Sequence, residues 1–370
     1  MTRLAIRNLF QSRTRLAISV GGVALALMLI LSLDAIVGWI EKRVTAYIDA
    51  SGADIWVSQE GVRNMHMASS SFSSSLATGV ARVEGVDSVT PILYLTNVVD
   101  AGGEQTISYV IGLPDRARAG MPWIIRSGRG NPGRGGAVID QGIAEASGIG
   151  LGGTVEILGD EFEVVGLSGG TASLTSSIAF ISSRDFAGLL ANPRVVSFLL
   201  VRLEPGASSP EVARRIEAQV RGVTAQTREE FASQERKVVR DMSTDLMTIM
   251  NTVGFLIGLA VMGLTVYTAT LARRAEYGVL KAVGARNRDL YLSVGVQALV
   301  SVVLGLVVGL SFTLALAGII PRFVSNLGLQ ITLEALVRVG AASLIFAGAA
   351  ALLPIRQIRR LDPAQVFRRK

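Results

Sequence analysis

Hydrophobic positions in this chain gather in four long runs, and more polar segments separate them. Each run is near or above the roughly 20 apolar residues that a helix needs to cross about 30 Å of hydrocarbon. The pattern therefore predicts four transmembrane helices, one near the beginning of the sequence and three near its end. The predicted spans are residues 16–40, 247–271, 290–320 and 335–353.

Residues 41–246 follow a different pattern, in which short β-like runs alternate with turn residues and helical stretches. Gly159 and Asp160 predict a hairpin turn between two of these runs. The segment is long enough to bury a core of its own. The predicted fold class is an α-helical membrane protein with a mixed α/β domain inserted between its first and second spans. The predicted strands are ADIWVSQ, VTPILYLTNVVD, TISYVIGLP, GTVEILGDEFEVVGL, SIAFIS and SFLLVRLEPG, and the predicted helices are GVARVEG, QGIAEASG and SSPEVARRIEAQVRG, the last with Ser209 as its N-cap.

Residues 227–250 place five apolar side chains along one face at helical spacing and run directly into the second span. We expect one continuous helix here, which projects from the membrane as a stalk and pairs with residues 41–50. Its apolar face is interpreted as a packing surface and not as a ligand site. The five residues are Phe231, Val238, Met242, Leu246 and Ile249.

Charge predicts the orientation of these segments. Half of the 370 residues are hydrophobic and 18% are charged, against roughly a quarter in an ordinary soluble protein. Residues 1–15, 273–289 and 354–370 together hold 15 basic and 3 acidic residues, whereas residues 41–246 hold 19 basic and 24 acidic ones. By the positive-inside rule, the three basic segments are cytoplasmic and residues 41–246 lie outside. The net charge of +7 therefore gives no support to nucleic-acid binding.

The first run is interpreted as a retained membrane anchor and not as a secretory signal. Its apolar core is too long for a signal, and Glu41, Lys42 and Arg43 follow it where a small-residue cleavage site would stand. The sequence has no cysteine, so a disulfide framework and a thiolate metal site are both excluded.

Motifs for catalysis or cofactor binding are weak. No lysine follows a glycine, so the phosphate-binding GxxxxGK[ST] loop is absent. The stretch GIGLGG matches a dinucleotide-binding pattern at Gly148, Gly150 and Gly153, but it follows a predicted helix and precedes a strand, so we interpret it as a turn. His66 is the only histidine, and its neighbourhood NMHM is either an ordinary loop or a soft Met/His group for haem or Cu(I). We expect no catalytic, cofactor-binding or metal-binding residue in this chain.

Three further features have both a structural and a functional interpretation. Asp34 and Arg338 lie near the outer ends of the first and fourth spans, where interfacial anchoring is favoured over a proton relay. Residues 68–78, rich in serine, are a flexible loop or a substrate-gating loop. Two GxxxG spacings allow close helix packing within a bundle or across a dimer. Their glycines are Gly254, Gly258, Gly305 and Gly309.

The order of these segments and several local sequences resemble the FtsX/MacB-type (type VII) family of ABC-transporter permeases. The resemblance covers the whole chain and includes LAIRNLFQSRTRLAISVGGVALA at the beginning, GAVIDQGIAEASGIGLGGTVEILGDEFEVVGL in the inserted domain, and LLPIRQIRRLDPAQVFR at the end. Glu276, Gly278, Leu280, Ala282 and Gly284 follow the family's E-x-G-x-L-x-A-x-G-A pattern, which Ala285 completes. The chain departs from many relatives by having Gln297 in its third predicted span, where they carry a glutamate, and it has no fused ATPase domain.

The resemblance implies a permease subunit whose chemistry takes place on another chain. A cytoplasmic ABC ATPase would bind ATP and Mg²⁺, and two copies of the permease would form a dimer in a prokaryotic inner or plasma membrane. Relatives use closure of the ATPase to move the stalks and expel a hydrophobic or amphipathic substrate, some with an adaptor protein outside. The divisions that follow are a cytoplasmic N-terminal helix at 1–15, a MacB-like extracytoplasmic domain at 41–246, a cytoplasmic coupling helix at 272–289, an outer loop at 321–334 and a cytoplasmic tail at 354–370, with the four predicted spans between them.

Residues 272–289 are too polar to span a membrane, yet their composition favours a helix, with Gly284 placed to end it. Tyr277, Leu280 and Val283 can share an apolar face. A basic helix resting on anionic lipid explains the arginines. The acid and the glycines at the family's positions favour a coupling helix seated in a groove of the ATPase. The predicted coupling residues are Arg274, Glu276, Tyr277, Gly278, Leu280, Lys281, Ala282 and Gly284.

Three functions compete at this point. The first is a permease that exports or extracts an amphipathic substrate. The second is an FtsX-like signalling protein that transmits force to an extracytoplasmic partner such as a cell-wall hydrolase. The third is an intramembrane enzyme, which needs ionisable groups that converge at mid-bilayer, and the centres of the predicted spans hold none.

Overall fold

The computed structural model describes residues 13–171, 177–190, 192, 194–272, 274–283, 285–323 and 327–359. The chain divides into two compact units, with the divisions after Trp39 and after Met242. Residues 40–242 form an α/β domain, and the segments before and after them form a helical unit. These divisions compare with predicted limits of 41 and 246 for the inserted domain.

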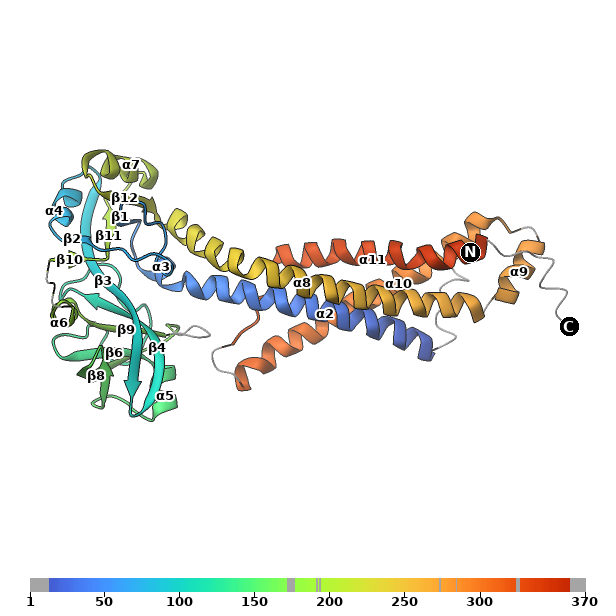
Figure 1. Ribbon diagram of the computed structural model, residues 1–370, viewed down its shortest axis with the longest axis horizontal. Coiled ribbons are helices and arrows are strands. Elements are labelled where there is room, and N and C mark those ends of the chain that lie inside the picture. Colours follow the sequence, from blue (N-terminus) through green and yellow to red (C-terminus); the bar gives the residue numbers. More distant parts are fainter. Residues whose placement is uncertain are drawn as a thin grey trace. The chain divides into compact units, whose positions relative to one another are not determined.

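The helical unit is built from long helices joined by short connections (Figure 1). Its described elements are α2 (Arg13–Val44), α8 (Arg228–Ala272), α9 (Arg274–Ala282), α10 (Asn287–Phe323) and α11 (Leu333–Arg359). Both α2 and α8 continue without a break into the α/β domain, so the predicted continuous stalk helix is present in α8.

Among the described residues, three helices are long and apolar enough to cross a membrane: Leu16–Val44, Arg228–Ala272 and Asn287–Pro321. The fourth predicted span, residues 335–353, lies inside α11. Residues 1–12 of the predicted N-terminal helix and residues 360–370 of the predicted tail lie outside the described part of the chain, as do residues 324–326 of the predicted outer loop.

A single hydrophobic core holds the helical unit together. Apolar side chains from α2, α8, α9, α10 and α11 all contribute to it, so the short helix α9 is packed onto the long ones. Among its most buried members are Leu27, Leu31, Met262, Tyr277, Leu290, Val294, Val302 and Val339.

The α/β domain contains one large mixed sheet. Its described strands follow the order β12-β1-β11-β3-β4-β9-β6-β8-β5, and β7 pairs with β3 and β8. The β4–β9 and β6–β8 pairs are parallel, and the others are antiparallel. The bounds are β1 Ile55–Gln59, β3 Val86–Ala101, β4 Glu104–Leu113, β5 Ile125–Gly128, β6 Gly136–Asp140, β7 Thr154–Ile157, β8 Asp160–Ser168, β9 Ser177–Ser182, β11 Phe198–Leu203 and β12 Val223–Thr227.

Short helices cover this sheet and follow its strands, and a two-stranded sheet of β2 (Phe72–Ser73) and β10 (Val195–Val196) lies beside it. Asp140 ends β6 and caps α5, because its carboxylate accepts the Gly142 N–H at 2.8 Å. The helices are α3 (Ala46–Ala50), α4 (Leu76–Ala81), α5 (Gln141–Ser147), α6 (Ser183–Leu189) and α7 (Ser209–Gln219).

All six predicted strand runs form strands, with small differences at turns and helix ends. The predicted hairpin is present, but its two-residue turn is Leu158–Gly159 and lies one residue early. Both residues have positive φ, 58° and 89°, as a type I′ turn requires. The N-cap position of α7 is Ser208 and not Ser209, and the Ser208 side chain makes no capping hydrogen bond. Helix α4 ends at Ala81, so the predicted helix GVARVEG was placed too late.

The serine-rich residues 68–78 are built into the domain, so the prediction of a plain loop is wrong for much of this segment. It contains β2 and the beginning of α4. Ser70 is buried and donates a hydrogen bond of 2.5 Å to the Ser197 carbonyl. These contacts tie the segment to the strands next to β10.

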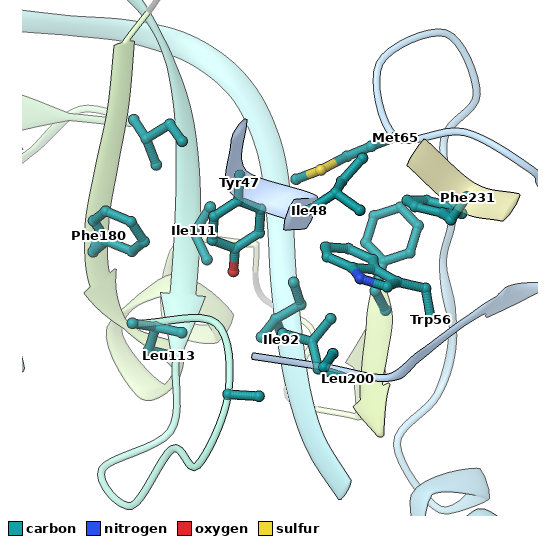
Figure 2. Packing of buried hydrophobic residues seen from close by; sticks show 14 of the residues in the cluster. Tyr47, Ile48, Trp56, Met65, Ile92, Ile111, Leu113, Phe180, Leu200 and Phe231 are labelled. Atoms are coloured by element: carbon teal, nitrogen blue, oxygen red, sulfur yellow. The ribbon is translucent and has the colours of Figure 1, made fainter. Parts of the chain in front are cut away.

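An aromatic cluster fixes the first turns of α8 in the α/β domain. Trp56 of β1 stacks on Phe231 of α8, with ring centroids 4.8 Å apart and an angle of 10° between the planes. Phe198 meets both rings edge-on, at 5.7 and 5.8 Å. Figure 2 shows Phe231 facing Trp56, and Tyr47 between Trp56 and Phe180. The residue that begins the predicted apolar face of the stalk is therefore a core residue.

Much of the rest of that apolar face is exposed within this chain. Met242, Leu246 and Ile249 have most of their surface accessible, whereas Val238 is half-buried, so the predicted packing inside the protomer is present at Phe231 and in part at Val238. The predicted pairing with residues 41–50 is present nearby. Arg240 of α8 forms two hydrogen bonds of 3.1 Å to the Glu41 carboxylate, and this paired geometry is the favourable one for arginine.

Candidate functional site

Helix α9 lies in sequence between α8 and α10, two of the helices long enough to span a membrane. The predicted helix at this position is therefore present, at Arg274–Ala282. Glu276 lies in its first turn and Lys281 in its last turn, so both charges are favourably placed with respect to the helix dipole.

One side of α9 packs into the chain's own core. Tyr277 is 5% exposed and belongs to the core of the helical unit, Gly278 is buried, and Leu280 packs against the same core. The Ala285 N–H donates to the Leu280 carbonyl at 2.9 Å, so the chain just after α9 is hydrogen-bonded back to the helix. Gly284, predicted to end this helix, lies outside the described residues.

The other side of α9 faces outward. Glu276, Val279 and Ala282 are exposed, and Val283, which follows the helix, is 83% exposed. The expectation that Tyr277, Leu280 and Val283 form one common face is therefore wrong, because the first two point into the core and the third points away from it. The surface of α9 available to another protein combines one acid with small apolar groups, and Lys281 is half-buried beside it.

Glycines permit the close packing of α10 against α2. A Cβ added to Gly305 would lie 2.6 Å from a methyl of Val23, and one added to Gly309 would lie 2.8 Å from the Ala24 carbonyl oxygen. At Gly254 of α8 the nearest atoms, from Leu29 and Ile30, would be 3.5 Å away. The structure thus places Gly254, Gly305 and Gly309 at contacts inside one protomer, and Gly258 is also buried.

Two protein-family models match this chain in sequence order. Residues 16–219 match the MacB-like periplasmic core domain, which is more than half of the chain, and residues 248–363 match the FtsX-like permease C-terminal domain. The chain belongs to the FtsX/MacB-type family of ABC-transporter permeases. The matched residues enclose α9 within the FtsX-like part, and every strand of the mixed sheet except β12 lies within the MacB-like part.

Full-length relatives carry the same description. The permease is 23% identical to an uncharacterized ABC transporter permease of Mycobacterium tuberculosis (strain H37Rv), with 98% of each chain covered. It is 24% identical over 193 residues to the probable syringafactin export ATP-binding/permease protein of Pseudomonas syringae pv. tomato. The aligned region covers 50% of this chain and 28% of that one. Among solved structures, the periplasmic region of MacB from Actinobacillus actinomycetemcomitans matches 50% of this chain and 94% of that one, at 13% identity and a TM-score of 0.39.

Two glycines of α10 provide a matched test of the permease's packing. Gly309→Ala should lower the stability by about 1–3 kcal/mol, because the new methyl meets a backbone oxygen that cannot rotate away. Gly318→Ala on the same helix should be neutral or stabilising by about 0.5–1 kcal/mol, because nothing lies within 4 Å of its added Cβ. Thermal unfolding in detergent measures both. Equal shifts for the two variants would contradict the assigned α2–α10 contact.

The two charges at the predicted outer ends of the spans lie close to each other. Arg338 of α11 is 3.7 Å from the Asp34 carboxylate of α2 and 3.1 Å from Glu334. This pairing fits the anchoring role favoured for Asp34 and Arg338 over a proton relay. Gln297 of α10, which stands where many relatives have a glutamate, is buried in the helical unit.

His66 pairs with a carboxylate. The ring Nδ1 of His66 is 2.7 Å from one carboxylate oxygen of Glu235 on α8. The backbone N–H of His66 donates to the other oxygen at 3.2 Å. Within the described residues, no group of three or more His, Cys, Asp or Glu is arranged to hold a metal. The predicted turn at GIGLGG is present, with Gly148 in the left-handed conformation at the end of α5. The pairing of His66 was not foreseen, since Glu235 lies 169 residues away in sequence.

Proposed function

We propose that this chain is the membrane subunit of an ABC transporter that exports or extracts a hydrophobic or amphipathic substrate. ATP and Mg²⁺ are bound by a separate cytoplasmic ATPase chain, whose closure is transmitted through this permease. The observation that carries the proposal is the combination of both family models in one chain with a short surface helix, α9, between two membrane-length helices. The names of the full-length relatives support the transporter class.

The proposed topology has four spans, formed by α2, the second part of α8, α10 and α11, with both termini in the cytoplasm of a prokaryotic cell. The support is the distribution of charge, with 15 basic and 3 acidic residues in the segments assigned to the cytoplasm. The α/β domain is then extracytoplasmic, and α9 is cytoplasmic.

Because the chain has no cysteine, single cysteines can test this topology directly. Arg134→Cys in the α/β domain should react with a membrane-impermeant maleimide in intact cells, since Arg134 is exposed. Val283→Cys should react only after the membrane is opened, although Val283 is 83% exposed. Labelling of position 283 in intact cells would contradict the topology.

In this proposal α9 is the coupling helix. Tyr277, Gly278 and Leu280 fix it to the membrane helices, so a force applied to α9 is passed directly into their common core. Glu276, Val279 and Ala282 offer the contact surface to the ATPase, with Arg274 and Lys281 adding positive charge to the segment. Charges give orientation to an interface of this kind, and a buried apolar contact gives affinity.

Two copies of the permease would form the functional dimer, because four spans leave little room to enclose a path for a substrate. The exposed apolar residues of α8, among them Met242, Leu246 and Ile249, supply a surface for such an assembly or for lipid. An adaptor outside the membrane is a further expected partner. The relative described as a probable syringafactin export ATP-binding/permease protein supports export as the function.

The second candidate function is FtsX-like mechanotransmission, in which the α/β domain regulates an extracytoplasmic partner such as a cell-wall hydrolase. The match of residues 248–363 to the FtsX-like permease C-terminal model is equally compatible with it, since that model names no substrate. ATP turnover by the reconstituted complex separates the two functions. A transporter should respond to amphipathic compounds, whereas a force-transmitting protein should respond only to its protein partner.

A further inference from the structure

Helix α2 carries a buried carboxyl group near the predicted outer end of its span. The Asp34 side chain is 6% exposed, and its Oδ2 atom lies 3.7 Å from a guanidinium nitrogen of Arg338 on α11. This distance is that of an ion pair and is too long for a hydrogen bond. Within the described part of the chain, Asp34 Oδ2 has no hydrogen-bond partner. A buried charged oxygen without a donor is costly, and most buried polar atoms in proteins are hydrogen-bonded.

A second buried oxygen without a partner belongs to helix α8. The Asn251 side chain interacts with the Asp34 carboxyl group. Its Oδ1 atom, like Asp34 Oδ2, accepts no hydrogen bond from any residue that the structure describes. A carboxylate oxygen and an amide oxygen are both acceptors, so they cannot bond to each other. A protonated carboxyl group can bond, because its O–H donates to the amide oxygen while its other oxygen accepts the amide N–H. One proton therefore satisfies both atoms in a cyclic acid–amide pair.

The charges around Asp34 favour the same proton. Asp34 and Glu334 share one described guanidinium, that of Arg338, which donates to Glu334 at 3.1 Å and lies farther from Asp34. Glu334 is 75% exposed, so water can solvate its charge. The described parts of α10 and of residues 327–332 add no charge beside Asp34. Two acids and one base leave a net negative charge next to an apolar bundle, and one proton on Asp34 makes the cluster neutral.

We propose that Asp34 carries a proton and donates it in a hydrogen bond to Asn251, so that an acid–amide pair joins α2 to α8. When the O–H bond breaks and the proton passes to water, the carboxylate loses its bond to the amide oxygen and pairs with Arg338 of α11. Helices α2 and α8 both continue into the α/β domain, whereas α11 lies wholly in the helical unit. One proton site is thereby linked to the two helices that connect the units. This switch does not rest on the proposed export function.

Infrared spectroscopy of the purified full chain in lipid nanodiscs tests the proton directly. A protonated carboxyl group has a carbonyl stretch that a carboxylate lacks. With all aspartates isotope-labelled at the side-chain carboxyl carbon, we expect this band at neutral pH, shifted by the label. It should disappear in Asp34→Asn, whose amide has the same shape and replaces the O–H donor with an N–H. The band should remain in the control Glu334→Gln, because Glu334 is the exposed, ionised acid of the cluster.

Two further variants separate the proposed bonds from a merely structural contact. Asn251→Leu should move the band to higher frequency, because the carboxyl group loses its hydrogen-bond partner. Arg338→Gln should make the band persist to more alkaline pH, because a cation that stabilises the carboxylate is removed. These two shifts also test the proposal if Asp34→Asn does not fold.

Three results would count against the switch. If the labelled protein showed no aspartic acid band at neutral pH, Asp34 would be ionised and its contact with Arg338 a plain ion pair. A band that Asp34→Asn retained would belong to another aspartate and would equally overturn the proposal. A band whose loss at alkaline pH was unchanged in Arg338→Gln would exclude the exchange of partners between α8 and α11.

Discussion

Glu276→Arg is expected to release the partner ATPase from the permease, or to leave it bound with ATP turnover uncoupled from transport. Glu276 is exposed in the first turn of α9, so reversing its charge changes the proposed contact surface. Val279→Asp should act in the same way, because Val279 belongs to the apolar part of that surface. Loss of a buried interface contact costs about 2 kcal/mol or more, which corresponds to a loss of affinity of roughly 30-fold.

Co-purification with the ATPase and transport in reconstituted vesicles measure these effects. Arg286→Ala is the matched control, since Arg286 is an exposed charge beyond the end of α9 and should change binding little. Leu280→Asp is unsuitable as an interface probe, because Leu280 packs on the core of the helical unit. If Glu276→Arg and Val279→Asp both retained the ATPase and full transport, a helix lying on anionic lipid would replace the coupling helix.

Phe231→Ala is expected to destabilise the α/β domain by about 3–5 kcal/mol, the usual cost of removing a large buried aromatic side chain. Phe231 is fully buried and stacked on Trp56, and it attaches the first turns of α8 to β1. Hydrogen exchange in the first turns of α8 and thermal unfolding of the full chain measure the change.

Met242→Ala is the control for this variant, because Met242 lies on the same helix and is 70% exposed. A substitution at such a site should shift stability by no more than about 0.5 kcal/mol. Similar effects at positions 231 and 242 would show that the aromatic cluster is not what fixes α8 to the domain.

Much of the architecture could be predicted because hydrophobic period and turn chemistry are local signals. The β7–β8 hairpin was predicted from Gly159 and Asp160, although the turn itself is Leu158–Gly159 and needs Leu158 at positive φ, which leucine rarely adopts. Strand β5 (Ile125–Gly128) was missed because it holds a single large apolar residue, and β12 (Val223–Thr227) was missed because its alternation is short and Val223 is its one large apolar residue. Strand β6 is buried along its whole length, so it lacks the alternating pattern that marks a half-exposed strand.

The location of helix α9 in the chain was predicted, but the side chains that it turns toward the core were not. Helical spacing places Tyr277, Leu280 and Val283 close together, but it does not say which of them meets another helix. The core formed with α10 and α11 takes Tyr277 and Leu280, and the end of the helix turns Val283 outward. The His66–Glu235 pair was equally beyond the reach of sequence patterns, because its partners come from distant segments.

The central claim is that this chain couples an ATPase on another polypeptide to movement in the membrane. Its most direct test is ATP hydrolysis measured for the purified chain, alone and after addition of its ATPase, in lipid nanodiscs. We expect no specific turnover by the chain alone, because it lacks a phosphate-binding GxxxxGK[ST] loop. We expect stable binding of the ATPase and vanadate-sensitive turnover that the Glu276→Arg variant abolishes or uncouples. ATP hydrolysis by the purified chain after every ATPase is removed would contradict the account. An ATPase whose rate of ATP hydrolysis is the same with and without this chain would also contradict it.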